Sequence, residues 1–217
     1  MNKKIIDPKL IIKLYKKGYF PMADNATSQN INFYKPETRF IIPIEKFHIP
    51  RRLLTEFKKK KFNYSINQKF NIVIKNCSEN RINGHTWINQ TIRDTYIELY
   101  KQGIAKSIEC YLDNKLVGGL YGIHIGKCFF GESMYSKITN VSKLTLLFLI
   151  SILNEYKFGL LDSQFYNQHL IQFGAYEILN KEYQQKLNKN IDEVSFFPDF
   201  FDYQKSISIL QSLTHKS

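Results

Sequence analysis

The sequence has few of the residues that metal sites and disulfide frameworks require. Its three cysteines, Cys77, Cys110 and Cys128, are odd in number and form no C-x-x-C pair. They are typical of small buried side chains in a reducing compartment. The five histidines are scattered without metal-ligand spacing. We therefore expect neither a disulfide nor a metal site.

Long apolar runs are also missing. The longest, LTLLFLISIL at 144–153, is shorter than the roughly 18 residues that indicate a membrane span. The first residues, MNKKIIDPKLIIKLY, lack the apolar centre of a secretory signal because Asp7, Pro8 and Lys13 interrupt them. We expect a cytoplasmic protein that does not enter a membrane.

Acidic residues are scarce relative to basic ones. The chain has 31 Lys and Arg against 19 Asp and Glu, a formal net charge of +12. This balance favours a polyanionic partner, most simply nucleic acid, because each neutralised phosphate releases counterions. The alternative is that the many Lys, Asn and Ile residues reflect an AT-rich genome. With 217 residues, 43% of them hydrophobic, the chain is expected to form one sizeable domain plus a small appendage.

The hydrophobic period changes along the chain from helical to strand-like and back. Helical patterns cover 7–18, 50–62, 70–77, 89–103 and 140–156, with a further helix at about 164–172 and another after 179. Strand patterns cover 38–44, 64–67, 105–112, 115–125, 127–136, 175–179 and a short run that ends on Asp162. We expect Pro43 to confine the first strand to a sheet edge, and hairpin turns at 113–114 and Gly126. An antiparallel meander, a helix and a returning strand predict an α+β domain with helices on a mixed sheet.

The run KFGLLDSQ ends a buried strand with a carboxylate and an amide. Asp162 and Gln164 are two residues apart, so on a strand they would face the same side. A carboxylate can hold or deprotonate an amine, and an amide can donate to a developing oxyanion. The alternative is that Asp162 caps the helix that follows.

Two further segments can each be interpreted in two ways. Glu132 lies in the apolar run FFGESMYS, where a carboxylate is costly unless it is paired or hydrogen-bonded. It predicts either a cationic ligand such as arginine or a structural ion pair. Trp87, the only tryptophan, lies in NGHTWI and is either a core anchor or a stacking platform.

Taken together, the motifs resemble those of the leucyl/phenylalanyl-tRNA–protein transferases. The resemblance runs in order from about Pro8 to Leu187. The motifs are GYFPM, FHIPRRL, NGHTWI, AKSIECYLDNKLVGGLYGI, FFGESMYSKITNVSK, LLDSQ and HLIQFGA. GESMYS with the following SK, together with LDSQ, makes the resemblance specific. The chain departs from the family pattern at Tyr34, Lys35, Lys106 and Tyr111, and in the segment ILNK at 178–181.

The resemblance implies an activity and an architecture. Such enzymes move leucine or phenylalanine, and methionine less well, from aminoacyl-tRNA to proteins that begin with arginine or lysine. The product is an N-terminal degradation signal, and no metal or nucleotide cofactor is used because the aminoacyl ester is already activated. A small N-terminal domain, here 1–36, would precede a GNAT-like acyltransferase domain at 37–217 with a mostly antiparallel sheet. We expect a monomer.

The resemblance also implies roles for individual residues. Asp162 and Gln164 match the catalytic Asp-x-Gln, with Asp162 acting on the incoming amine directly or through Gln164. Glu132 would face the basic acceptor, and Trp87 would stand at the tRNA 3′ end. The pocket for the aminoacyl side chain would comprise Leu120, Phe129, Ser133, Met134, Leu146, Leu153 and Leu161.

Two other functions compete with this one. A GNAT acyl-CoA transferase should carry a pyrophosphate-binding R-x-x-G-x-G/A loop before the long helix, and SKITNVSK has none. A non-catalytic RNA-binding module would bind tRNA without transfer.

Overall fold

A mixed sheet of seven strands organises the described part of the chain. The computed structural model describes residues 4–79 and 86–214. The strand order is β4-β5-β6-β7-β8-β3-β9, and all neighbours are antiparallel except β7 and β8, which are parallel. Their bounds are β3 (Thr38–Ile42), β4 (Asn63–Ile66), β5 (Ala105–Leu112), β6 (Lys115–Ile125), β7 (Cys128–Ser136), β8 (Leu160–Asp162) and β9 (Tyr176–Leu179). The predicted meander and mixed sheet are confirmed.

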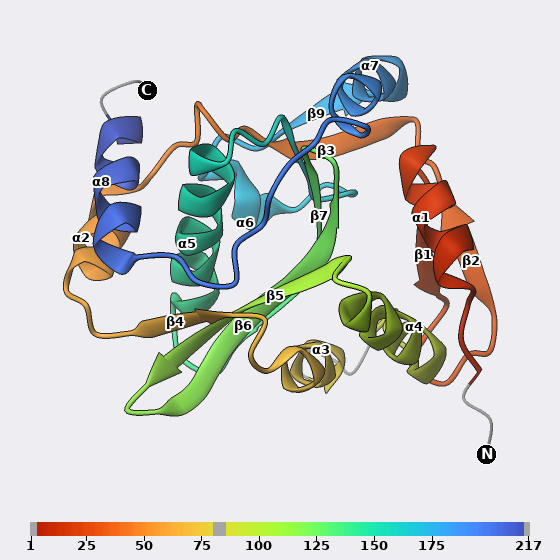
Figure 1. Ribbon diagram of the computed structural model, residues 1–217, viewed down its shortest axis with the longest axis horizontal. Coiled ribbons are helices and arrows are strands. Elements are labelled where there is room, and N and C mark those ends of the chain that lie inside the picture. The colour runs from red at the N-terminus through yellow and green to blue at the C-terminus, as the bar shows by residue number, and fades with distance from the viewer. Residues whose placement is uncertain (1–3, 80–85, 215–217) are drawn as a thin grey trace.

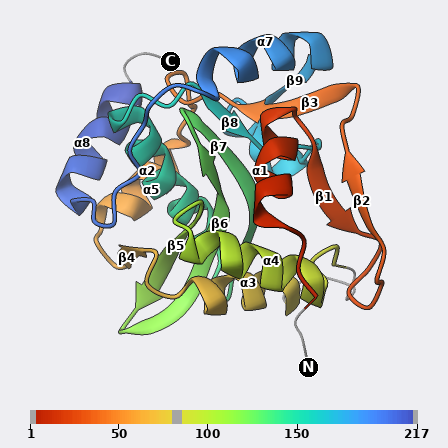
Figure 2. The same ribbon diagram turned by 45° about the vertical axis from the view of Figure 1, so that its right-hand side comes forward.

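Helices cover both faces of this sheet (Figures 1 and 2). One face carries α5 (Val141–Glu155), on which α2 (Arg51–Lys58) and α8 (Tyr203–Thr214) pack. The other carries α1 (Pro8–Lys16), α3 (Phe70–Glu79), α4 (Gln90–Lys101) and α7 (Asn180–Asn190). Strand residues alternate between the two cores: on β7, Phe129 joins the α5 side, whereas Cys128 and Phe130 join the other. The predicted α+β class is confirmed.

The N-terminal residues pack against the helices of the second face. The Asp7 side chain caps α1 by accepting from the Lys9 amide at 3.0 Å, and Pro8 begins the helix, as predicted. After Gly18, β1 (Phe20–Ala23) and β2 (Ile31–Tyr34) form a separate two-stranded antiparallel sheet that the sequence analysis did not predict. The division of the chain at residue 36 stays a prediction.

Three expectations need correction or completion. β3 lies between β8 and β9 rather than at an edge; it ends at Ile42, so Pro43 does not interrupt its ladder. The helix expected at 164–172 is the single turn α6 (Gln168–Ile171), and α8 was not predicted. The three cysteines are buried, as expected. No helix in residues 4–79 and 86–214 has both the length and the apolar character to cross a bilayer.

Glycines in the VGGLYG segment of β6 admit neighbouring protein atoms rather than a ligand. A methyl group on Gly118 would overlap Val141 of α5. On Gly122 it would overlap the carbonyl oxygen of Phe130 and the ring of Phe129, at the point where the β6–β7 register shifts. The glycines therefore let α5 and β7 approach β6 closely.

This packing predicts different effects for two glycine substitutions. Gly122→Ala should lower the free energy of unfolding by about 1–3 kcal/mol, because the overlapping carbonyl belongs to a central strand and cannot move freely. Gly131→Ala on β7 is the matched control: its methyl group would meet only the Asp162 carbonyl oxygen, at 3.6 Å. The control should change stability by no more than about 0.5 kcal/mol. Urea unfolding of both variants measures the difference, and equal losses would contradict this account.

Candidate active site

The parallel pair β7–β8 separates at the point where the candidate residues lie. β8 pairs with β7 only over Cys128–Phe130, with Asp162 opposite Phe130. β7 continues to Ser136, whereas the chain after Asp162 turns away at Gln164, whose φ is +63°. The space between them is a cavity of about 280 Å³, called here the first cavity.

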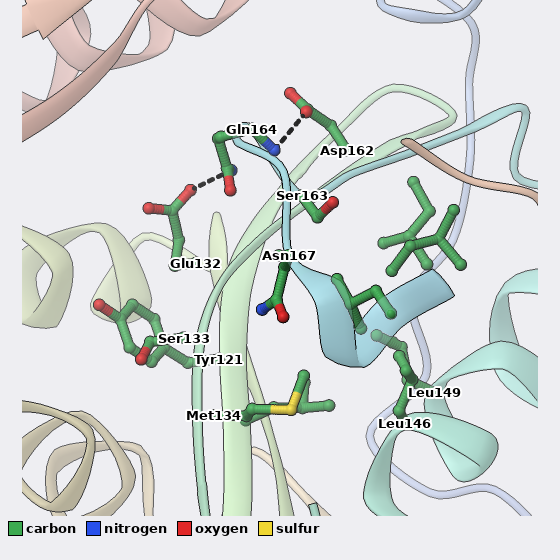
Figure 3. A pocket seen from close by; sticks show the side chains of 15 residues that line it. Tyr121, Glu132, Ser133, Met134, Leu146, Leu149, Asp162, Ser163, Gln164 and Asn167 are labelled. Carbon is green, nitrogen blue, oxygen red and sulfur yellow. Dashed lines mark hydrogen bonds between the residues drawn. The ribbon is translucent and has the colours of Figure 1, made fainter. Parts of the chain in front are cut away.

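The first cavity has an apolar end and a polar end. Figure 3 shows Met134, Leu146 and Leu149 at one end, and Glu132, Gln164 and Asp162 at the other. Apolar side chains that line it are Ile42, Leu120, Met134, Leu146, Leu149, Leu161 and Leu170. A short apolar side chain joined to a polar reacting group matches this division.

Asp162 is held by a buried arginine. Arg39 on β3 donates from Nη2 to Asp162 Oδ2 at 2.7 Å and from Nε to both carboxylate oxygens at 3.1 and 3.2 Å. The Tyr183 hydroxyl adds a bond to Oδ2 at 2.8 Å. The side chains of Arg39 and Asp162 are 1% and 0% exposed. Arg39 and Tyr183 thus give the buried carboxylate an ion pair and a further hydrogen bond.

Arg39 in turn is fixed by the N-terminal segment and by α7. Its Nη1 donates to the Gly18 carbonyl at 2.9 Å. Its guanidinium lies between the rings of Phe20 and Tyr183, with 4.6 and 4.4 Å from Cζ to the ring centroids. The Arg39 guanidinium that pairs with Asp162 is therefore itself fixed, by one hydrogen bond to the backbone and by two aromatic rings.

The same carboxylate shapes the turn that carries Gln164. The backbone N–H of Gln164 donates to Asp162 Oδ1 at 2.8 Å, and the backbone carbonyl of Gln164 accepts from the backbone N–H of Phe40 at 3.1 Å. Asp162 and Gln164 do not share a strand face, contrary to the prediction, because β8 ends at Asp162 and the backbone of Gln164 is left-handed. The helix-cap alternative is also wrong: Asn167 caps α6. Asp162 instead closes an Asx-type turn.

Gln164 links this buried pair to Glu132, as Figure 3 shows. Its Nε2 donates to Glu132 Oε1 at 3.2 Å. Glu132 also accepts from the hydroxyls of Tyr15 at 2.7 Å and Tyr96 at 3.0 Å. Burial raises the pKa of Glu132 to about 7, although the two tyrosine hydrogen bonds act to lower it. Among the described residues, Glu132 is held by hydrogen bonds from two hydroxyl groups and a side-chain amide rather than by an ion pair. The cationic ligand stays a prediction.

A second cavity of about 230 Å³ lies on the other side of Glu132 and Gln164. Its walls are mainly aromatic and apolar: Phe20, Met22, Trp87, Phe165 and Tyr166. Both cavities are lined by Glu132, Ser163, Gln164 and Asn167. These four residues form the junction between an apolar hollow and an aromatic one.

The structure brings most of the predicted site residues together. Asp162, Gln164, Glu132, Leu120, Ser133, Met134, Leu146 and Leu161 all line the first cavity, and Trp87 lines the second. Phe129 and Leu153 do not line either one. Phe129 stacks on Phe197 at 5.5 Å, and both Phe129 and Leu153 are fully buried in the α5 core. Their side chains are apolar and close in sequence to the cavity, but face away from it.

Four polar residues of the site were not predicted: Tyr15, Arg39, Tyr96 and Tyr183. Arg39 had a signal that could have found it, because a charge inside the apolar strand TRFII needs a buried partner. The tyrosines had none, since Tyr15, Tyr96 and Tyr183 fit the apolar faces of their helices. Within residues 4–79 and 86–214, no three His, Cys, Asp or Glu side chains gather as metal ligands.

Comparison with known proteins identifies the family. The family model of leucyl/phenylalanyl-tRNA protein transferase matches residues 41–188. The chain belongs to this family. A leucyl/phenylalanyl-tRNA–protein transferase of Zymomonas mobilis subsp. mobilis is 40% identical over 196 residues, 90% of this chain and 72% of its own. That of Gloeobacter violaceus is 40% identical over 182 residues, 84% of this chain and 92% of its own.

Solved structures add less than these relatives. The structure of L-PGS from Bacillus licheniformis aligns at 10% identity with a TM-score of 0.43, over 92% of this chain and 68% of its own. This similarity is too low to establish a common fold. The family name therefore rests on sequence, and the chain is a transferase by that membership.

The buried pair of Arg39 and Asp162 should contribute more to stability than an exposed ion pair of the same chain. Arg39→Met should cost about 3–5 kcal/mol, because it leaves the Asp162 charge buried without its partner. Lys16→Met is the matched control: Lys16 pairs with Asp192 at 2.6 Å, but the two side chains are 43% and 75% exposed. The control should cost less than about 1 kcal/mol. Chemical denaturation at neutral pH measures both, and similar losses would show that burial does not decide the strength of the Arg39 pair.

Proposed function

We propose that this chain transfers leucine or phenylalanine, and methionine less well, from aminoacyl-tRNA to acceptor proteins that begin with arginine or lysine. The modified N-terminus would act as a degradation signal. The observation that carries the proposal is the pair of cavities that meet at Glu132 and Gln164. An aminoacyl-tRNA end has the same layout: an apolar side chain, an ester, and a planar base.

The first cavity would receive the side chain of the transferred amino acid. Its apolar end, with Leu120, Met134 and Leu146 on the wall, offers no hydrogen-bonding group to select among apolar side chains. One methylene group is worth only about 1–3 kcal/mol in such a pocket. Acceptance of leucine, phenylalanine and, less well, methionine follows from this limited discrimination.

The second cavity would receive the terminal adenosine of the tRNA. Trp87, Phe20 and Phe165 offer aromatic faces there, and stacking on an aromatic side chain stabilises a base by about 1–3 kcal/mol. The rest of the tRNA would contact the basic surface that the net charge of +12 implies. With the side chain in one cavity and the adenosine in the other, the ester lies at their junction.

Gln164 and Glu132 would act at that junction. The side-chain amide of Gln164 can donate toward the ester carbonyl oxygen, where negative charge develops as the amine attacks. Asp162 would act through Gln164, because its own oxygens already accept hydrogen bonds from Arg39, Tyr183 and the backbone N–H of Gln164. Glu132 would face the basic N-terminus of the acceptor.

The remaining expectations follow from the same resemblance. The 37–217 region would be GNAT-like, with 1–36 as a small N-terminal domain. The enzyme would act in the cytoplasm as a monomer and use no cofactor, because the aminoacyl ester supplies the activation.

A transfer assay tests the function. Purified protein is incubated with labelled Leu-tRNA or Phe-tRNA and a peptide that begins with arginine, without ATP or added metal. Label should appear on this peptide and not on one that begins with alanine. tRNA binding without any transfer would instead favour the RNA-binding module, and coenzyme A binding by calorimetry would favour the acyl-CoA transferase.

Two leucines of α5 separate pocket shape from core packing. Leu146→Ala should enlarge the first cavity and raise transfer of phenylalanine relative to leucine by about tenfold, within the 1–3 kcal/mol range of such pockets. Leu153, seven residues further along the same helix, is buried outside the cavity. Leu153→Ala should cost about 2–5 kcal/mol of stability and leave the ratio unchanged. Competition between Phe-tRNA and Leu-tRNA gives the ratio, and a shift in the Leu153 variant alone would refute the pocket assignment.

A further inference from the structure

Three oxygen-bearing side chains close a ring beside the junction of the two cavities. The hydroxyls of Tyr15 on α1 and Tyr96 on α4 lie 2.5 Å apart. Tyr15 lies 2.7 Å from Glu132 Oε1, and Tyr96 lies 3.0 Å from Glu132 Oε2. Each side chain of the ring thus contacts both others at hydrogen-bond distance.

The number of protons decides which form of Glu132 fits this ring. Burial raises the pKa of both tyrosines well above 10, so each keeps its one proton. If Glu132 is ionised, the ring holds only the two tyrosine protons for its three oxygen–oxygen contacts. One of the three contacts then has no hydrogen atom between the two oxygens. A protonated Glu132 supplies the third proton, and every contact becomes a hydrogen bond.

We propose that Glu132 accepts the proton of the acceptor's α-ammonium group, and that Tyr15 and Tyr96 are positioning residues whose hydroxyls donate to the ionised carboxylate and close the ring with it once it is protonated. The proposal rests on the proposed function and specifies what Glu132 does in it. Because Glu132 lines both cavities, an amine that reaches the ester also reaches this carboxylate.

Asp162 is not suited to this step. Its side chain is 0% exposed, and its oxygens accept bonds from Arg39, Tyr183 and the Gln164 amide. Its carboxylate is already engaged in an ion pair with a buried guanidinium. The two carboxylates thus have different roles: Asp162 pairs with Arg39 and fixes Gln164, and Glu132 takes up the proton.

Two protons leave the acceptor nitrogen in the proposed step. The acceptor ammonium gives one proton to Glu132 and becomes a neutral amine. Its nitrogen then attacks the ester carbon, so that the C–N bond forms and the C–O bond to the terminal ribose breaks. The second amine proton goes to the departing ribose oxygen. Glu132 later releases its proton to solvent.

The pKa values of donor and acceptor lie close together, so the proton transfer costs little free energy. An N-terminal amine titrates at about 7.7–8.0, and burial raises the pKa of Glu132 to about 7. An unperturbed glutamate, at about 4.3, would be a much weaker base. The titratable groups that face Glu132 come from five elements: Tyr15 (α1), Arg39 (β3), Tyr96 (α4), Tyr121 (β6) and Asp162 (β8).

The first test needs no activity. A carboxyl group whose pKa is about 4.3 in the unfolded chain and about 7 in the folded one stabilises the folded state fully at low pH. That contribution is lost as pH rises from about 4 to about 7, because only the unfolded state ionises freely there. The urea midpoint of the wild type should therefore fall relative to that of Glu132→Gln over this window and run parallel above it. Parallel curves throughout would overturn the ring.

The same measurement tests the tyrosines. Tyr96→Phe breaks the ring. It should therefore move the pH range over which the protein loses stability. Tyr135→Phe, which removes a buried phenol hydroxyl of β7 outside the ring, should leave the window in place. Identical windows for both variants would remove Tyr96 from the proposal.

The second test uses transfer and two acceptors. One peptide begins with ordinary arginine; in the other, an aminooxy group replaces the α-amine and is unprotonated at neutral pH. Glu132→Gln should slow transfer to the first about 100-fold, the low end for a general base, and leave transfer to the second nearly unchanged. Glu132→Asp withdraws the carboxylate from the ring. It should likewise slow transfer to the first peptide and leave transfer to the second nearly unchanged. Equal losses with both acceptors would make Glu132 a binding residue and overturn the proposal. Wild-type protein that transfers to neither would overturn the proposed function itself.

Discussion

The buried ion pair between Arg39 and Asp162 determines the geometry of the candidate site. Asp162 ends a strand of three residues, and its side chain rather than a longer ladder fixes the direction of the chain that follows. Arg39 can hold it because β3 lies next to β8 and because two aromatic rings enclose the guanidinium. The left-handed Gln164, its bond to Glu132 and the opening between β7 and β8 all follow from this arrangement.

The site separates two tasks that one carboxylate could not perform together. A group that must keep a turn in place needs fixed partners, and Asp162 has them in Arg39, the Tyr183 hydroxyl and the backbone amide of Gln164. A group that exchanges a proton needs its two forms to be nearly equal in free energy, and the burial of Glu132 among hydroxyl groups brings them close. Gln164, a side chain without charge, connects the two without transmitting a proton between them.

Local features of the fold were predictable because their causes are local. Asp113 and Asn114 adopt positive φ in the β5–β6 turn, and Gly126 does so in the next, as turn-forming residues do. The cap of α1 and the buried face of α3 depend on neighbouring residues alone. Long-range features were not predictable in this way. The place of β3 inside the sheet depends on β8 and β9, which come more than a hundred residues later.

The candidate site shows the same limit. Hydrophobicity marks a residue as buried, but it does not tell whether the residue faces a cavity, as Leu146 does, or packed core, as Leu153 does. Asp162 and Gln164 were found by their chemistry, although the strand geometry assumed for them does not hold. The tyrosines around Glu132 and Asp162 have apolar rings that satisfy the helix pattern, so only the fold reveals where their hydroxyl groups point.

The sequence separations within the Arg39 cluster bear on how the protein is made. Arg39 is 123 residues from Asp162 and 144 from Tyr183, so a ribosome must add 144 residues after Arg39 before the last member of the cluster appears. Until α7 emerges, the growing chain lacks one ring of the guanidinium enclosure and one donor to Asp162. The candidate site therefore forms only after α7 has been synthesised and does not belong to an early folding unit.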